Sequence, residues 1–237
     1  MKNILLVFIF IGSIFNSINF EKKQIIPNEI IKLVSKNKKI KFPFFEYKNK
    51  TVSDKINQTL RDSLKDKLDE PFEKDDIKTI IENVSKILDV CSYEVFYSKN
   101  TVSIVFIFES SSGAYPTSWS EYYNFSKLTG KLLSTKDIFS DKRDFLKRFK
   151  SKEKIYIKNY IKELTQTDAD TSNVKIAIRE INDGCFKYFD DRFKIQKDVF
   201  YFYPNYCVPH FMQNIAPYEP IVFSKMELKN ILKKEYQ

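Results

Sequence analysis

The spacing of apolar residues changes near residue 90, and this change most constrains the fold. Apolar residues recur every four positions over residues 51–66, which predicts an amphipathic helix, and a second stripe predicts a helix over residues 74–88. Beyond them, apolar and polar residues alternate over residues 93–97 and 102–108, on either side of a Ser-Lys-Asn turn. This alternation predicts a β-hairpin. The chain therefore combines helices and strands.

The remaining patterns extend this mixture. We expect further extended segments at residues 40–45, 118–125, 132–133, 193–195, 199–203 and 221–223, and further helices at residues 27–34, 142–164, 174–181 and 226–232. Strands joined by short turns favour antiparallel pairing, and the helices do not alternate strictly with strands. The predicted fold class is α+β, an antiparallel sheet of hairpins with helices packed on one face. With only four glycines and no Gly/Ser-rich linker, we expect a single compact unit.

The first 20 residues have the layout of a secretory signal. A short basic start precedes the apolar run Ile4–Ile11, and polar residues return from Asn16. The apolar stretch is about 12 residues, shorter than the ~20 that span a bilayer. We expect export, periplasmic or secreted, with an uncleaved N-terminal anchor as the alternative, and no membrane span after signal cleavage. The rest divides into an expected N-terminal region, 21–95, that packs on a C-terminal domain, 96–237.

The net charge of +9 is spread over many lysines rather than gathered in one block. This distribution favours a Lys-rich solvated surface, and it predicts no nucleic-acid partner. The alternative is attraction to acidic envelope polymers or to an anionic membrane surface.

The chain contains three cysteines, Cys91, Cys185 and Cys207. In an exported protein such residues tend to pair, and we favour Cys185 with Cys207 as a disulfide. Closing that loop would stabilise the fold by about 3 kcal/mol. Cys91 would remain, buried at the start of a strand, although spacing alone leaves the pairing open.

Catalytic patterns are missing. The single histidine, His210, lies three residues after Cys207, and no second such pair completes a metal site. Adjacent carboxylates such as Asp190 and Asp191 point to opposite sides of a strand, so they make a poor catalytic pair. We therefore predict a protein that is not an enzyme and has no metal or cofactor.

Aromatic residues offer a binding surface instead. Tyr115, Trp119 and Tyr122 lie near the turn at residues 112–116, and Tyr206 and Tyr218 lie in a later tyrosine-rich loop. Such side chains stack on sugars or anchor protein partners. The alternative for them is ordinary packing of a sheet face.

Several segments form a recognisable series in their order and spacing: residues 102–106, 113–116, 123–125, 129–131, 137–139, 200–206, 216–223 and 226–228. They resemble the extracellular domain of the anti-sigma-V factor, a lysozyme-sensing regulator, and residues 40–44 are similar to the region that precedes that domain. The same domain of unknown function occurs beside some polysaccharide deacetylase domains. The family usually has Gly-Gly-Ala-His-Pro at the turn, where this chain has Ser112 and Tyr115 in place of the first Gly and the His.

This resemblance implies an α+β fold and an exported, non-catalytic bacterial envelope domain that binds lysozyme or peptidoglycan. We expect Tyr115, Trp119, Tyr122, Tyr206 and Tyr218 to contact the partner. Two alternatives stay open: a cell-wall hydrolase that uses His210 with a carboxylate, and an inhibitor of a muramidase.

Overall fold

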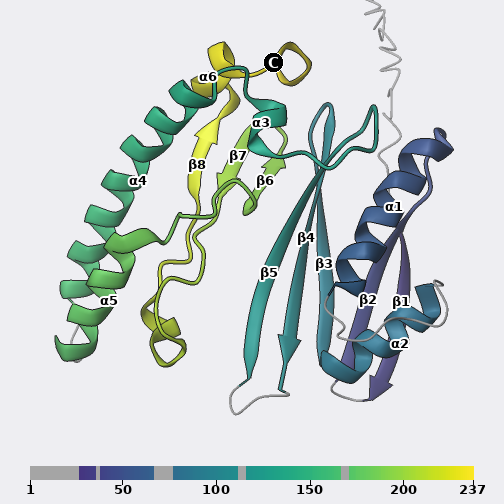
Figure 1. The fold of residues 1–237 in the computed structure, drawn as a ribbon, viewed down its shortest axis with the longest axis horizontal. Helices are drawn as coiled ribbons and strands as arrows, with labels where there is room; N and C mark the ends of the chain where they lie inside the picture. Colours follow the sequence, from purple (N-terminus) through teal and green to yellow (C-terminus); the bar gives the residue numbers. More distant parts are fainter. Residues whose placement is uncertain (1–26, 36–37, 67–76, 112–115, 167–170) are drawn as a thin grey trace, which may run out of the picture.

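The computed structural model of the protein describes residues 27–35, 38–66, 77–111, 116–166 and 171–237, and within them the chain forms an α+β fold with two sheets (Figure 1). The first sheet has the order β1 (Pro27–Ser35), β2 (Lys38–Phe45), β3 (Val90–Tyr97), β4 (Thr101–Ser110), β5 (Thr117–Ser126). The second has the order β6 (Phe193–Gln196), β7 (Val199–Phe202), β8 (Ile221–Ser224). The expected fold class is confirmed. The expected signal at residues 1–20 and Tyr115 lie outside the described residues.

The long helices form two groups, one beside each sheet. On the first sheet lie α1 (Lys50–Lys65) and α2 (Ile77–Ile87). At the opposite end of the view in Figure 1, α4 (Lys142–Thr165) lies against the second sheet, and α5 (Thr171–Gly184) packs on α4 and on the segment at residues 210–215. Each sheet thus carries helices on one face, as expected, but the molecule has two sheets rather than one. Short helices complete the set: α3 (Thr135–Ile138), η1 (His210–Ile215), α6 (Lys225–Leu228), η2 (Lys229–Ile231) and η3 (Lys234–Tyr236).

Several predicted elements differ in detail. The segment expected as a helix at residues 27–34 is strand β1, which pairs antiparallel with β2. Its β-branched residues suit a strand, and so short a pattern does not separate the two periods. One pair, β2 with β3, is parallel, so the first sheet is mixed rather than antiparallel throughout. The expected division between residues 95 and 96 falls inside β3, which pairs with strands on both sides.

Two smaller expectations are also modified. The segment at residues 132–133 contributes a single bridge, Phe125 to Leu132, rather than a strand. The expected closing helix at residues 226–232 is split into α6 and η2. None of the helices in the described part of the chain has the length and apolar character needed to cross a bilayer.

The first core lies between the first sheet and its two helices. Alternate residues of β4 point into it because successive strand side chains face opposite sides. The four-residue stripe of α1 meets them from the other side, as the periodicity predicts. The buried side chains include Val52, Ile56, Leu60, Leu64, Val102, Ile104, Phe106 and Phe108.

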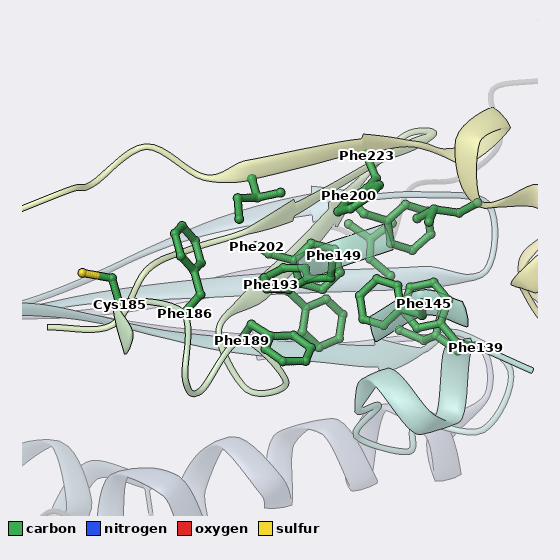
Figure 2. Packing of buried hydrophobic residues seen from close by; sticks show 14 of the residues in the cluster. Phe139, Phe145, Phe149, Cys185, Phe186, Phe189, Phe193, Phe200, Phe202 and Phe223 are labelled. Carbon is green, nitrogen blue, oxygen red and sulfur yellow. The ribbon is translucent and has the colours of Figure 1, made fainter. Parts of the chain in front are cut away.

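The second core is built largely of phenylalanine and lies between the second sheet and α4 (Figure 2). Phe149 stacks on Phe189 with ring centroids 4.3 Å apart, and Phe145 lies 5.3 Å from Phe202. Truncating one such ring to alanine typically costs about 3–5 kcal/mol. Figure 2 also shows Cys185 at the margin of this cluster.

The two sheets meet where strand β6 crosses the face of the first sheet. The amide of Ile195 donates to Ser103 Oγ at 2.9 Å, and Asn124 Nδ2 donates to the carbonyl of Phe193 at 2.7 Å. Ser103 Oγ also lies 2.5 Å from Asn124 Oδ1. Side chains of β4 and β5 thus satisfy backbone groups at the edge of β6, which buried backbone requires.

A disulfide joins Cys185 to Cys207, the pair favoured by the sequence, with Cα atoms 4.8 Å apart. It connects the residue after α5 to the segment that follows β7. Cys91 is a buried thiol near the start of β3, and its Sγ donates to the carbonyl of Lys41 at 3.5 Å. The turn between β5 and α3 uses Gly130 at φ +70°, where a Cβ would lie 2.6 Å from the carbonyl oxygen of Val52.

Candidate functional site

The expected aromatic surface is divided by the sheet. Trp119 and Tyr122 lie three residues apart on β5, so their side chains point to opposite faces. Trp119 lies on the face covered by α1 and α2, 5.3 Å from the ring of Phe108, and its Nε1 donates to Glu121. Trp119 is therefore part of the first core's packing, the alternative given above for these aromatic residues.

Tyr122 lies on the other face and joins a cluster around an arginine. Its ring stacks on Tyr203 at 4.8 Å, and the Arg192 guanidinium lies 5.4 Å from the Tyr122 ring and 5.5 Å from the Tyr206 ring. We call Tyr122, Arg192, Tyr203 and Tyr206 the Arg192 cluster. Cation–π contacts of this kind are favourable and hold the guanidinium between the rings.

The Arg192 cluster is anchored to the outer edge of β5. Tyr206 Oη donates to the carbonyl of Ser118 at 2.6 Å, and Arg192 Nη1 donates to the carbonyl of Ser120 at 3.3 Å. Arg192 Nε also donates to Pro204 at 3.0 Å. Because β5 is the last strand of its sheet, these bonds occupy carbonyls to which the amides of another strand would otherwise donate.

A hollow of about 470 Å³ lies along the same edge. Residues 120–124 of β5 form one wall, and residues 132–134, Asp137 of α3 and residues 190–193 form the others. We call this space the β5 hollow. Its charged lining residues are Glu121, Asp137, Asp190, Asp191 and Arg192. Its volume is in the range of small-molecule sites, and it is open to solvent.

Most of the acidic side chains around the β5 hollow are held by neighbours. Asp190 accepts from Thr135 and pairs with Lys142 at 3.2 Å. Desolvation alone would raise the pKa of Asp137, but hydrogen bonds from Lys131 and Ser134 outweigh it and lower that pKa to about 2. Asp191 is exposed. The hollow thus offers an acidic rim beside one fixed guanidinium.

The tyrosines of the cluster stay protonated at ordinary pH. Desolvation by burial raises the pKa of Tyr122 to about 12, and burial also raises the pKa of Tyr203 and of Tyr206. They therefore act as neutral hydrogen-bonding rings. Such rings, together with arginine, are the side chains enriched at binding hot spots.

The other expected residues lie apart from this cluster. Tyr218 is 75% exposed and lies near Tyr156 and Tyr160 of α4. His210 begins η1, and its side chain lies outside the described part of the structure. Among the described residues, no group of three or more His, Cys, Asp and Glu side chains is placed to hold a metal ion.

The sequence interpretation missed Arg192, whereas Tyr203 begins the tyrosine-rich loop that it proposed as part of the partner surface. Tyr203 directly follows β7, and Tyr201 and Tyr203 alternate with buried phenylalanines. Because successive side chains of a strand face opposite sides, this alternation predicts that the Tyr203 side chain points away from the second core. Arg192 follows two aspartates and shows no pattern of its own. Its role depends on the distant strand β5, which no local signal reveals.

The fold and the site define an α+β protein with an aromatic, arginine-centred cleft at a sheet edge. The chain shares its fold with the crystal structure of a DUF3298 family protein from Pseudomonas aeruginosa PAO1, at 12% identity and a TM-score of 0.56 over 90% of this chain and 94% of that one. Neither a family model nor a curated protein sequence matches the chain. At this identity the likeness shows the fold alone.

Proposed function

We propose that the chain is an exported, non-catalytic binding protein of the bacterial cell envelope, and that its partner enters the β5 hollow beside the Arg192 cluster. The signal-like start of the sequence supports export. The shared fold supports the class, because the DUF3298 family is related to the C-terminal domains of anti-sigma-V factors.

The observation that carries the proposal is the placement of Tyr122, Arg192 and Tyr206 at one edge of β5, next to a hollow that solvent reaches. Tyr206 is 50% exposed, so its ring can still contact a partner. Neutral aromatic rings and a pre-positioned guanidinium bind with little further loss of side-chain freedom. This arrangement suits recognition rather than bond cleavage.

The acidic rim favours a cationic protein such as lysozyme over a peptidoglycan fragment that carries carboxylates. The two ligands respond oppositely to one change. In Asp191→Arg, we expect affinity for lysozyme to fall about tenfold or more, because opposite charges at an interface become like charges. Affinity for a carboxylate-bearing muropeptide would instead rise.

Isothermal titration of lysozyme and of muropeptides into each variant measures this effect. Asp183→Arg is the matched control, since Asp183 is also an exposed aspartate but lies on α5 outside the lining of the β5 hollow. Tyr206→Ala and Tyr218→Ala form a second pair. We expect loss of binding with the first and no change with the second. If the two variants of each pair changed the affinity equally, the proposed site would be refuted. It would also be refuted if the wild type bound neither ligand.

The same protein samples separate the two alternatives. An inhibitor would suppress muramidase turnover when it binds, whereas a simple binder would leave turnover unchanged. A hydrolase would release soluble fragments from peptidoglycan and lose that activity in His210→Ala. Such turnover would overturn the non-catalytic assignment.

A further inference from the structure

Helix α4 concentrates the positive charge of the protein. Its 24 residues contain nine Lys and Arg against three Asp and Glu, a formal charge of +6, where the whole chain carries +9. In sequence these lysines look scattered, because apolar residues that face the second core separate them. The helix restores their proximity, since residues three and four apart are neighbours on its surface.

Five of these cations form one line. Arg143, Lys147, Lys150, Lys154 and Lys158 follow each other at steps of three or four residues, and all are exposed. At 100° per residue they fall within an arc of about 80°, and at 1.5 Å per residue they extend over about 22 Å. We call this line the α4 ridge. It lies on the side of α4 opposite to Phe145 and Phe149.

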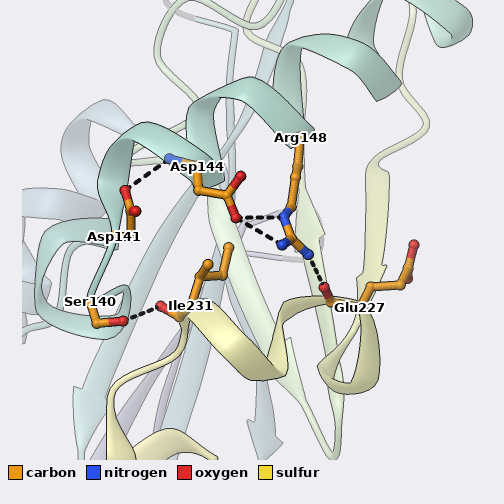
Figure 3. A network of polar contacts seen from close by, with 6 residues as sticks. All are labelled: Ser140, Asp141, Asp144, Arg148, Glu227 and Ile231. Carbon is orange, nitrogen blue, oxygen red and sulfur yellow. Dashed lines mark hydrogen bonds and ion pairs between the residues drawn. The ribbon is translucent and has the colours of Figure 1, made fainter.

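The cations of α4 that flank the ridge serve the fold instead. Arg148 donates to Asp144 at 2.8 Å and to the carbonyl of Glu227, as Figure 3 shows, and Lys152 bonds Glu227 at 2.6 Å. Of the ridge, only Lys150 has a carboxylate partner among the described residues, Glu153 at 2.5 Å. Four of the five ridge cations therefore keep their charge available to an external anion.

The form of the ridge favours a linear partner over a membrane surface. A helix that lies in a bilayer interface inserts an apolar face, but the apolar side of α4 is buried against the second sheet. Ile155 is the one exposed large hydrophobic residue of the helix among those described. A single line of cations about 4.5–6 Å apart along the helix can meet successive charges of one extended polymer.

We propose that the α4 ridge binds a linear polymer whose backbone carries phosphate groups, with the polymer lying along the line of cations. This site lies on a different element from the β5 hollow and does not depend on the proposed function. Binding that neutralises several phosphates releases counterions, so affinity falls steeply with salt.

The experiment compares two variants of equal net charge. The ridge variant carries Arg143→Gln, Lys147→Gln, Lys154→Gln and Lys158→Gln, and glutamine keeps a helix propensity close to those of arginine and lysine. The control carries Lys55→Gln, Lys99→Gln, Lys136→Gln and Lys229→Gln, which are exposed lysines outside α4. Circular dichroism melting checks that both variants fold. Fluorescence anisotropy then measures binding of labelled long-chain polyphosphate at several salt concentrations, with tripolyphosphate and phosphatidylglycerol vesicles as competitors.

The ridge variant should lose at least about tenfold in affinity, and its salt slope should fall by about 3, since each neutralised phosphate of a single strand contributes about 0.7. The control should stay within about threefold of the wild type, and tripolyphosphate should compete weakly. Equal losses in both variants would show attraction to net charge alone. That result, stronger binding of vesicles, or no binding of polyphosphate would each overturn the proposal.

Discussion

At the scale of single residues, two small polar side chains join the sheets. Ser103 and Asn124 are buried in the face of the first sheet and satisfy the backbone of Phe193 and Ile195 in β6. In an apolar surrounding, an unpaired amide or carbonyl is costly, so these two residues fix where β6 docks.

Ser103→Ala should therefore destabilise the protein by about 1–3 kcal/mol, because it leaves the Ile195 amide without its acceptor. Urea unfolding followed by the fluorescence of Trp119, the one tryptophan of the chain, measures the change. Ser118→Ala is the control, since Ser118 is exposed and surface changes usually stay within about 0.5 kcal/mol. An equal effect of the two substitutions would contradict the docking role.

Two acidic residues at helix starts predict acid sensitivity. Hydrogen bonds from Lys152 and the Ser224 amide lower the pKa of Glu227 to about 2, and the Asp137 pKa is also lowered to about 2. Their folded-state pKa lies below the value in the unfolded chain. Their stabilisation is thus complete above about pH 4.5 and is lost as the pH falls toward 2.

The double variant Asp137→Asn, Glu227→Gln should be less stable than the wild type at neutral pH, with the gap closing as the pH falls through this range. Urea midpoints at a series of pH values test this expectation. Asp183→Asn, which lies outside both helix starts, should keep the wild-type profile. A constant gap between the double variant and the wild type would refute the electrostatic explanation.

For single residues, the sequence predicted the kind of interaction that a side chain makes better than the place of that side chain in the fold. The disulfide partners were identifiable because three cysteines leave few pairings, and Cys185 and Cys207 lie in one region that was predicted to form a terminal strand hairpin. The prediction that Trp119 and Tyr122 share one surface was wrong, because residues an odd number of positions apart on a strand point to opposite faces of the sheet. Arg192 was invisible because its contacts come from β5, more than sixty residues earlier in the chain.

At the scale of elements, periodicity was reliable where it was long. The stripe of α1 and the alternation of β4 predicted both elements and their buried faces. Strand β1 was mistaken for a helix because its pairing with β2 decides its conformation. The parallel contact of β2 with β3 could not be predicted, since the path through α1 and α2 that permits it is a property of tertiary packing.

The disulfide is the clearest test at this scale. It closes a loop of 22 residues that contains all of β6 and β7. Reduction should lower the free energy of unfolding by about 3 kcal/mol. Urea unfolding with and without a reductant measures the difference. The variant Cys185→Ala, Cys207→Ala should match the reduced wild type and ignore the reductant. A wild type equally stable in both conditions would contradict this account.

At the scale of the whole molecule, two helix-covered sheets leave different surfaces for different partners. The edge of β5 carries the Arg192 cluster and an acidic rim, whereas α4 carries a formal charge of +6. The sequence indicated the fold class and the excess of cations. It could not separate the two surfaces, because each is assembled by elements distant in the chain.

The central claim is that a partner binds at the outer edge of β5. Nuclear magnetic resonance of the isotope-labelled protein, titrated with lysozyme and separately with muropeptides, tests it most directly. The account predicts that amide shifts at residues 120–124 and 190–193 change first and most strongly with one of these ligands. Changes centred on Tyr218, Tyr156 and Tyr160, or no changes with either ligand, would contradict it.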